Sequence, residues 1–265
     1  MKTAHGFFGA FKYEFLMQLR RPALWLVILV TGLFVFGSAI LPSQLEPSAN
    51  PLRLVADKTS TVAFFLLVAA GILLADRSPR DRTLKTTELL NSFPTSLGAR
   101  WWGKYLGVAL ATAVPIALFC LVTIGYYAFL TRNVSLFVLE PLVFAAIVLP
   151  GLLFVGAFSL VCTLALPTAL YSILFIGYWV WGNLVPPRMM PTLNCTFLMP
   201  NGGYAESGFF GGGTVCDGSS IIATAPQAWE SIVLLLGCAV LAMFIGHCIW
   251  TGAQRRRKGN THDAN

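Results

Sequence analysis

The stretch PLVFAAIVLPGLLFVGAFSLVCTLALPTALYSILFIGYWVWGNLVPP, residues 141–187, runs for 47 positions without a charged side chain. One helical crossing of a bilayer needs about 20 apolar residues, so this stretch is too long for one crossing and has room for two. Leu166-Pro167-Thr168 near its middle is the predicted turn, because proline interrupts a helix. The sequence therefore predicts two successive spans, 139–164 and 168–185.

Three more apolar blocks precede this stretch and one follows it. Only 11% of the residues are charged and 56% are hydrophobic, whereas a soluble domain carries about 25% charged residues. A soluble fold of this length could not cover its surface with so few charges. The predicted fold class is an all-α integral membrane protein with six transmembrane helices. The four additional predicted spans are 23–41, 59–75, 105–130 and 231–251.

A short helix is predicted ahead of the first span, over residues 6–21. Phe8, Phe11, Phe15 and Leu19 recur there at steps of three and four among polar residues. This spacing is typical of an amphipathic helix lying in the membrane interface; the alternative is a mobile tail with chance periodicity. The first apolar block follows this polar segment and is too long for a signal sequence, so we expect it to stay in the mature protein.

The distribution of Lys and Arg predicts the orientation. With the N-terminus in the cytoplasm, 14 of the 18 basic residues fall on inner segments, and the outer segments hold the other four. This bias agrees with the positive-inside rule, so both termini are expected to be cytoplasmic. The basic residues border apolar blocks and do not form a patch interleaved with aromatics, which argues against nucleic-acid binding. The four outer basic residues are Arg53, Lys58, Arg132 and Arg188.

The sequence lacks the motifs of several functional classes. It contains no GxxxxGK[ST] phosphate loop, no HExxH and no GxSxG, and it has only three histidines. The predicted span interiors lack the ionisable residues typical of ion-driven transporters, since Glu140 and Glu230 are expected near outer ends and His247 near an inner end. We expect no enzyme activity, metal or cofactor in this chain.

The outer loop 188–227 is rich in Gly, Pro, Ser and Thr and holds two of the six cysteines. Cys195 and Cys216 lie on the side expected to be oxidising, where a disulfide would restrain a loop with little core of its own; two free thiols are the alternative. Asn194-Cys195-Thr196 also matches a glycosylation sequon, which the sequence leaves undecided. The remaining cysteines lie within predicted spans.

The longest inner loop, 76–104, connects the second and third spans. A short cytoplasmic helix is predicted over 81–93, ended by Pro94, and Leu84, Glu88 and Leu89 would project from it. Its surface could contact a cytosolic partner or lie on lipid, and the spacing alone does not decide between them. Beyond it, Gly103 and Gly107 have the GxxxG spacing that allows close contact between helices.

Two segments carry a resemblance to a known family. The run DRTLKTTELLNSFPTSLGARWWGKYLG, residues 81–107, resembles the cytoplasmic loop of type-two ABC exporter permeases, with a Glu-Leu-Leu core, a Ser-x-Pro break and a Gly-Lys-x-x-Gly start to the third span. KYEFLMQLRRPALW, residues 12–25, is similar to that family's interfacial helix turning into its first span. One departure is Lys85-Thr86-Thr87, where the family often has Gly-Thr before the Glu-Leu-Leu run.

This resemblance implies a permease subunit of an ABC transporter. Such a subunit pairs with a second permease copy or homologue in the cell membrane, here expected to be a prokaryotic plasma membrane, and with two cytosolic ATPases that bind ATP and Mg²⁺. The short inner helix inserts into a groove on the ATPase, so the resemblance assigns Leu84, Glu88 and Leu89 to that contact. Exporter activity follows from the family, not from the composition.

By the same analogy, spans one, two and five would line the substrate path. A mostly apolar lining with a few polar groups suits a hydrophobic or amphiphilic cargo, although such residues also serve ordinary helix packing. Two other functions stay open: a nontransporting scaffold or sensor that binds through the loop 188–227, and a lipid-modifying enzyme, which the missing catalytic groups disfavour. The candidate path residues are Thr31, Ser38, Tyr171, Ser172 and Asn183.

Overall fold

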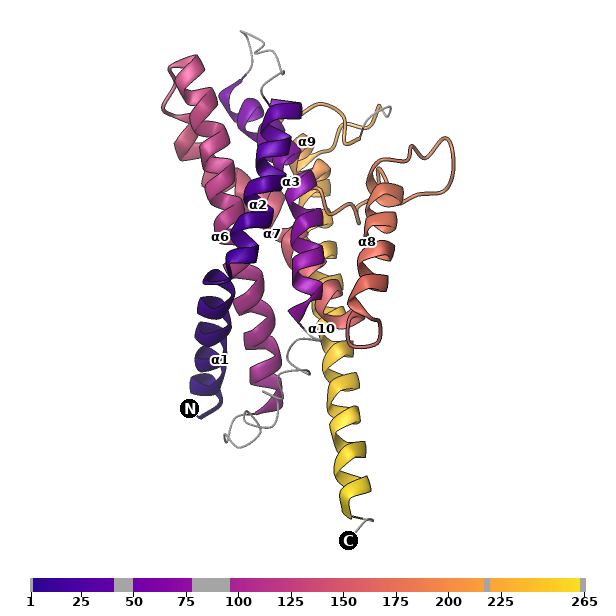
Figure 1. The fold of residues 1–265 in the computed structure, drawn as a ribbon. Coiled ribbons are helices and arrows are strands. Elements are labelled where there is room, and N and C mark those ends of the chain that lie inside the picture. The colour runs from indigo at the N-terminus through magenta and orange to yellow at the C-terminus, as the bar shows by residue number, and fades with distance from the viewer. Residues whose placement is uncertain (1, 41–49, 78–95, 217–219, 263–265) are drawn as a thin grey trace.

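The computed structural model describes residues 2–40, 50–77, 96–216 and 220–262, and these residues form helices and connecting segments without a strand (Figure 1). The coupling helix predicted at 81–93 lies outside the described residues. The helices are α1 (Lys2–Leu19), α2 (Pro22–Val35) with a π-helical turn (Phe36–Ile40), α3 (Pro51–Ala75), α6 (Leu97–Thr131), α7 (Leu136–Cys162), α8 (Thr168–Asn183), α9 (Gly203–Phe210) and α10 (Ala225–His262).

Several of these helices are long and apolar enough to cross a membrane. They are α3, α6, α7 and the Ala225–Gly252 part of α10, and the pair α1–α2, which is bent by 56° at Arg20 and Arg21, is a fifth candidate. The prediction of a helical, multi-pass membrane protein is confirmed at this level. The fifth predicted span, 168–185, corresponds to α8, whose 16 residues extend about 24 Å, less than the roughly 30 Å of a hydrocarbon core.

Three helices begin earlier than the hydropathy predicted. α3 begins at Pro51 and not at 59, where Asn50 caps it by accepting a hydrogen bond from the Leu52 N–H. α6 begins at Leu97, capped by Ser96 and ahead of the predicted span 105–130, and α10 begins at Ala225, ahead of the predicted span 231–251. The polar composition of 42–58 predicts a loop with a short surface helix at most, whereas 51–58 are the first turns of the long helix α3. Helix propensity and capping continue a helix through polar residues that hydropathy excludes.

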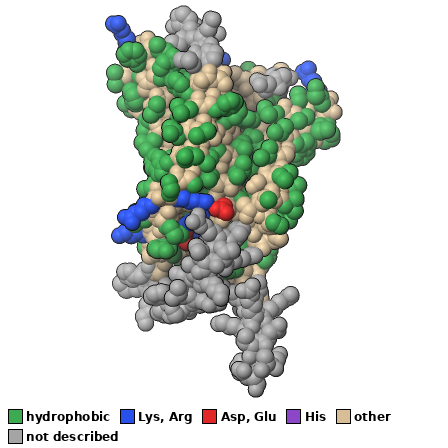
Figure 2. Space-filling view, viewed as in Figure 1, with side chains coloured by type: hydrophobic (Ala, Val, Ile, Leu, Met, Phe, Trp, Pro, Cys, Tyr) green, Lys and Arg blue, Asp and Glu red, His purple; other side chains and the backbone are tan. Residues whose placement is uncertain are grey.

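α3 is the central helix of the bundle. It packs against α2, α6, α7, α8 and α9, and its side chains form the middle of the main apolar core. α10 packs on α7 and α9 at the periphery. In its most apolar 18-residue stretch 28% is buried, whereas 61% of the corresponding stretch of α3 is buried. Figure 2 shows the hydrophobic side chains that remain on the outside of the bundle. This surface is apolar because its expected solvent is lipid.

α1 packs tightly along the first half of α6. A side chain at Gly107 would place its Cβ 2.7 Å from the Phe11 carbonyl oxygen, and one at Gly103 would lie 3.0 Å from the carbonyl of Phe7. The predicted close helix contact at this GxxxG pair is confirmed, and its partner is α1. The face of α1 that is buried carries Glu14 and Gln18, whereas Phe8 of the predicted apolar stripe is 67% exposed.

Candidate functional site

The last two described residues before the segment 78–95 are held by ion pairs. Arg77 Nη2 lies 2.7 Å from Glu14 Oε2 of α1, and both side chains are buried. Arg21 Nη2, at the start of α2, lies 2.6 Å from Asp76 Oδ2. We call these four residues the ion-pair cluster. It joins the C-terminal end of α3 to α1 and to the first turn of the first predicted span.

Figure 2 shows basic and acidic side chains in a band below the hydrophobic surface, toward the end where Figure 1 places both termini. Arg100 of α6 also interacts with Glu14, and Gln18 Nε2 donates to Thr112 Oγ1 of α6 at 3.3 Å. α1 therefore contacts both the helix that leads into the segment 78–95 and the helix that follows it. The predicted ATPase-contact residues lie outside the described residues; they are Leu84, Glu88 and Leu89.

Two carboxyl groups lie at the opposite end of α3. Thr59 Oγ1 donates to Glu140 Oε2 of α7 at 2.7 Å, and the neighbouring Ser60 forms a hydrogen bond with Glu206 of α9. Burial raises the pKa of Glu206 to about 7, with a further raising effect from Asp57, against the lowering effects of Ser60, Arg53 and Lys58.

Glu140 was expected near the outer end of its span. The structure places it in the second turn of α7 but leaves only 1% of it exposed. Sequence reasoning missed its burial because its partner Thr59 is 81 residues away. A signal was present nonetheless, since a single Glu stands at the edge of the longest uncharged stretch in the chain.

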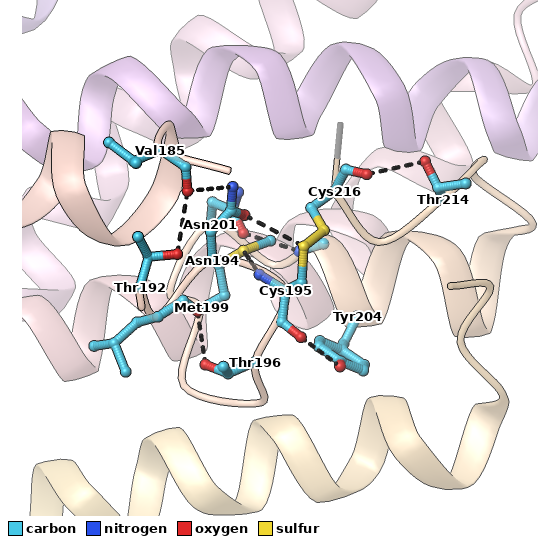
Figure 3. The surroundings of a disulfide bond; sticks show 12 residues. Val185, Thr192, Asn194, Cys195, Thr196, Met199, Asn201, Tyr204, Thr214 and Cys216 are labelled. Atoms are coloured by element: carbon cyan, nitrogen blue, oxygen red, sulfur yellow. Dashed lines mark hydrogen bonds between the residues drawn. A yellow bond between two sulfur atoms is a disulfide. The ribbon is translucent and has the colours of Figure 1, made fainter. Parts of the chain in front are cut away.

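The segment between α8 and α10 is more ordered than its composition predicted. Cys195 and Cys216 are at disulfide distance, with Cα atoms 5.6 Å apart (Figure 3), which supports the predicted pairing. Tyr204 of α9 donates from its hydroxyl to the Cys195 carbonyl at 3.0 Å. The expectation of little core is wrong, because a small apolar cluster forms here from Met199, Tyr204, Val215, Cys216 and Ala223.

The glycosylation sequon lies in the same segment. Asn194 is 4% exposed, and its Nδ2 donates to the Val185 carbonyl at 3.3 Å, as Figure 3 shows. Thr192 Oγ1 donates to the same carbonyl at 3.1 Å. The acceptor nitrogen of the sequon is therefore enclosed in the folded protein.

The five candidate path residues fall on two helices that both pack against α3. Thr31 is half-buried on α2 and Ser38 is exposed on the π-helical turn, while the other three belong to α8. α3 lies between α2 and α8 in the view of Figure 1. The structure thus groups the residues as a pair and a trio on separate helices.

The hydrogen bonds of these residues are mostly internal to their own helices. Ser38 donates to the Phe34 carbonyl, Ser172 to that of Thr168, and Asn183 to that of Trp179. Tyr171 differs, because its hydroxyl lies 2.8 Å from Ser159 Oγ of α7. The pattern fits ordinary helix packing for three of the five residues, and the path assignment stays a prediction.

Metal-ligating residues do not gather in the described part of the chain: no group of three or more His, Cys, Asp or Glu side chains there could hold an ion. The described cysteines outside the pair are Cys120, Cys162, Cys238 and Cys248, all free thiols.

No protein-family model matches the chain, and the search of curated proteins finds no significant match.

Proposed function

We propose that this chain is the transmembrane permease subunit of an ABC exporter, with a hydrophobic or amphiphilic cargo and a separate cytosolic ATPase as its motor. The observation that carries the proposal is the ion-pair cluster. Residues 78–95 include the proposed ATPase contact, and the residue that precedes them, Arg77, is bound to Glu14. α6, which follows them, is bound to the same helix α1 through Gly103 and Gly107.

This arrangement supplies a physical route for force. A displacement of the segment 78–95 acts on Asp76 and Arg77, and through their ion pairs on the start of α2 and on α1. Because α1 also packs along α6, three spans share one attachment. Coupling between distant sites travels through contiguous packed groups of this kind.

The course of the helices supports six spans with both termini in the cytoplasm. In Figure 1 the start of α1 and the end of α10 lie at one end of the molecule, together with the end of α3 and the start of α6. α8 would be the fifth span along the chain and would bring the total to six. The apolar residues that follow Asn183 and local thinning of the bilayer would complete its crossing. On this topology the segment 78–95 is cytoplasmic, as ATPase contact requires.

The proposed complex contains two ATPases and a second permease copy or homologue in the cell membrane of a prokaryote. α8 and α10 expose long rows of apolar side chains, which lipid or the second permease would cover. ATP and Mg²⁺ would bind to the ATPases alone. The proposed cargo path is the one between α2, α3 and α8, where Thr31, Ser38, Tyr171, Ser172 and Asn183 would contact an amphiphile.

Copurification tests the proposal. The tagged full chain, solubilised from its native membranes, should bring down a protein with a phosphate loop, identified by mass spectrometry. The double substitution Leu84→Asp with Glu88→Lys should abolish this association, because it removes an apolar contact and reverses a charge. The matched control, Arg188→Glu in the opposite segment, should leave it unchanged. If the double variant and the control both retain the ATPase, the assigned contact is wrong.

The alternative is a nontransporting scaffold or sensor that binds through residues 188–227. The observation in its favour is that this segment has a disulfide-distance pair, its own helix α9 and its own apolar cluster. It predicts that no phosphate-loop protein copurifies, and that a partner is lost on reduction of the cysteine pair. The two functions thus differ in which side of the chain binds protein.

A further inference from the structure

Glu140 lies in an environment that does not suit a charged carboxylate. Its side chain is 1% exposed, as is that of Thr59, whose hydroxyl donates to Oε2 at 2.7 Å. The second oxygen, Oε1, is buried and has no hydrogen-bond partner among the described residues. Placing an ionised carboxylate away from water with a single hydrogen bond is costly, and such a group stays neutral unless a cation compensates it.

The charged groups nearby on each neighbouring helix do not provide that cation. On α3, Lys58 Nζ is 2.7 Å from Asp57 Oδ2 and 5.6 Å from the centre of the Tyr127 ring of α6. Arg53 of α3 interacts with Glu206 of α9. Cys120 of α6 interacts electrostatically with Glu140 and carries no positive charge. Within the described ranges, Glu140 forms no ion pair.

We propose that Glu140 is a proton-binding site at the joint between α3 and α7. The ligand is a proton and not a divalent cation, because Ca²⁺ and Mg²⁺ need about six or more oxygen ligands and the side chains supplied here are one carboxyl and one hydroxyl. A neutral carboxyl carries no net charge, so leaving one of its oxygens buried without a partner costs less than it does for a carboxylate. Release of the proton leaves a charge between two packed helices and weakens their contact.

The site is separate from the ATPase contact proposed above. Glu140 is bound to Thr59 in the N-terminal half of α3, whereas the ion-pair cluster closes its C-terminal end. The bundle therefore holds a group that responds to pH on the side opposite to the proposed motor.

Carbodiimide labelling tests the proposal on the intact full chain in detergent micelles. N,N′-dicyclohexylcarbodiimide reacts with protonated carboxyl groups in apolar surroundings, and peptide mapping by mass spectrometry locates the adduct. We expect labelling at Glu140 that decreases as pH rises, and none at the exposed Glu230 of α10, which is the internal control. The wild-type protein suffices for this measurement, so it does not depend on whether a variant folds.

Two variants sharpen the assignment. Glu140→Gln should abolish the adduct and remove a protonated-carboxyl band from the infrared spectrum, which reads the proton without requiring reagent access. Thr59→Val removes the hydroxyl that donates to Glu140, so the carboxyl band should shift in frequency while Glu140 stays labelled. An absent carboxyl band together with absent labelling at every pH overturns the proposal. Protection of Glu140 from labelling by Na⁺ or K⁺ also overturns it, in favour of a cation site.

Discussion

The two ends of α3 bind acidic side chains in different ways. At the C-terminal end, Glu14 and Asp76 each lie within 2.7 Å of a guanidinium nitrogen. Toward the N-terminal end, Glu140 and Glu206 are bound by the hydroxyls of Thr59 and Ser60. One helix thus carries a charge-compensated end and a hydroxyl-bound end.

The two kinds of partner, guanidinium and hydroxyl, have different physical consequences for a buried carboxyl group. A guanidinium compensates a buried carboxylate in full and gives directional, bidentate-capable hydrogen bonds, which suits a permanent joint between helices. A hydroxyl compensates the charge only in part, and burial raises the pKa of Glu206 to about 7. The first arrangement suits a fixed joint between helices, and the second suits a group that gains or loses a proton.

The largest expected effect comes from breaking the charge-compensated end. Arg77→Met removes the guanidinium that lies 2.7 Å from the buried Glu14 carboxylate and leaves the interaction with Arg100, which costs roughly 3–5 kcal/mol in the free energy of unfolding. Chemical unfolding in mixed micelles, followed by tryptophan fluorescence, measures it. The control Arg188→Met removes an exposed Arg and should change the midpoint little. Equal midpoints for the two variants would show that the ion-pair cluster contributes nothing to stability.

The cysteine pair should have the next largest effect, confined to the other end. Replacing Cys195 and Cys216 with Ser removes a crosslink that spans 21 residues, which is worth about 3 kcal/mol by the loop-entropy estimate. Hydrogen exchange should speed up in α9 and its flanks but not in α1. Faster exchange in α1 as well would mean that the two ends are one cooperative unit.

A smaller effect is expected from Gly107→Ala, which tests whether α1 must pack closely for the ion-pair cluster to form. The new Cβ would lie 2.7 Å from the Phe11 carbonyl oxygen, and overpacking of this kind costs about 1–3 kcal/mol. Gly177→Ala in α8 is the matched control, because a Cβ there meets nothing within 4 Å. Thermal unfolding should separate them, and an unchanged Gly107 variant would show that α1 can shift at no cost.

The smallest effect is the pH dependence of the hydroxyl-bound end. Burial raises the pKa of Glu206 to about 7 from its ordinary 4.5, so between these values the folded state binds more protons than the unfolded state. The free energy of unfolding should therefore fall as pH rises from 4.5 to about 7, by on the order of 1–2 kcal/mol after allowance for partial exposure.

Glu206→Gln should reduce this dependence. Its stability should fall less steeply than that of the wild-type protein over the same interval, because the amide does not titrate and Glu140 is the remaining buried carboxyl at this end. Thermal unfolding at several pH values, with the Arg77→Met variant as a comparison, provides the measurement. A variant that keeps the wild-type slope would place the titrating group elsewhere.

The sequence predicted the helical elements well and their ends less well. Each predicted span coincides with a helix, because long apolar blocks are a local property. The helices α3, α6 and α10 begin before their apolar blocks do, and Asn50 and Ser96 cap α3 and α6 ahead of those blocks. The Cys195–Cys216 pairing could also be predicted from the sequence, since both residues fall in one segment between two predicted spans. The predicted ATPase contact lies outside the described residues and stays a prediction.

The sequence by itself determined the membrane class, the helices and the GxxxG contact surface, all of which are encoded by residues close together in the chain. Only the tertiary structure decided which polar residues meet. Glu14 and Arg77 are 63 residues apart and Thr59 and Glu140 are 81 apart, so no local pattern could pair them. A buried charge is tolerated only with a partner, and that partner is chosen by how the helices pack.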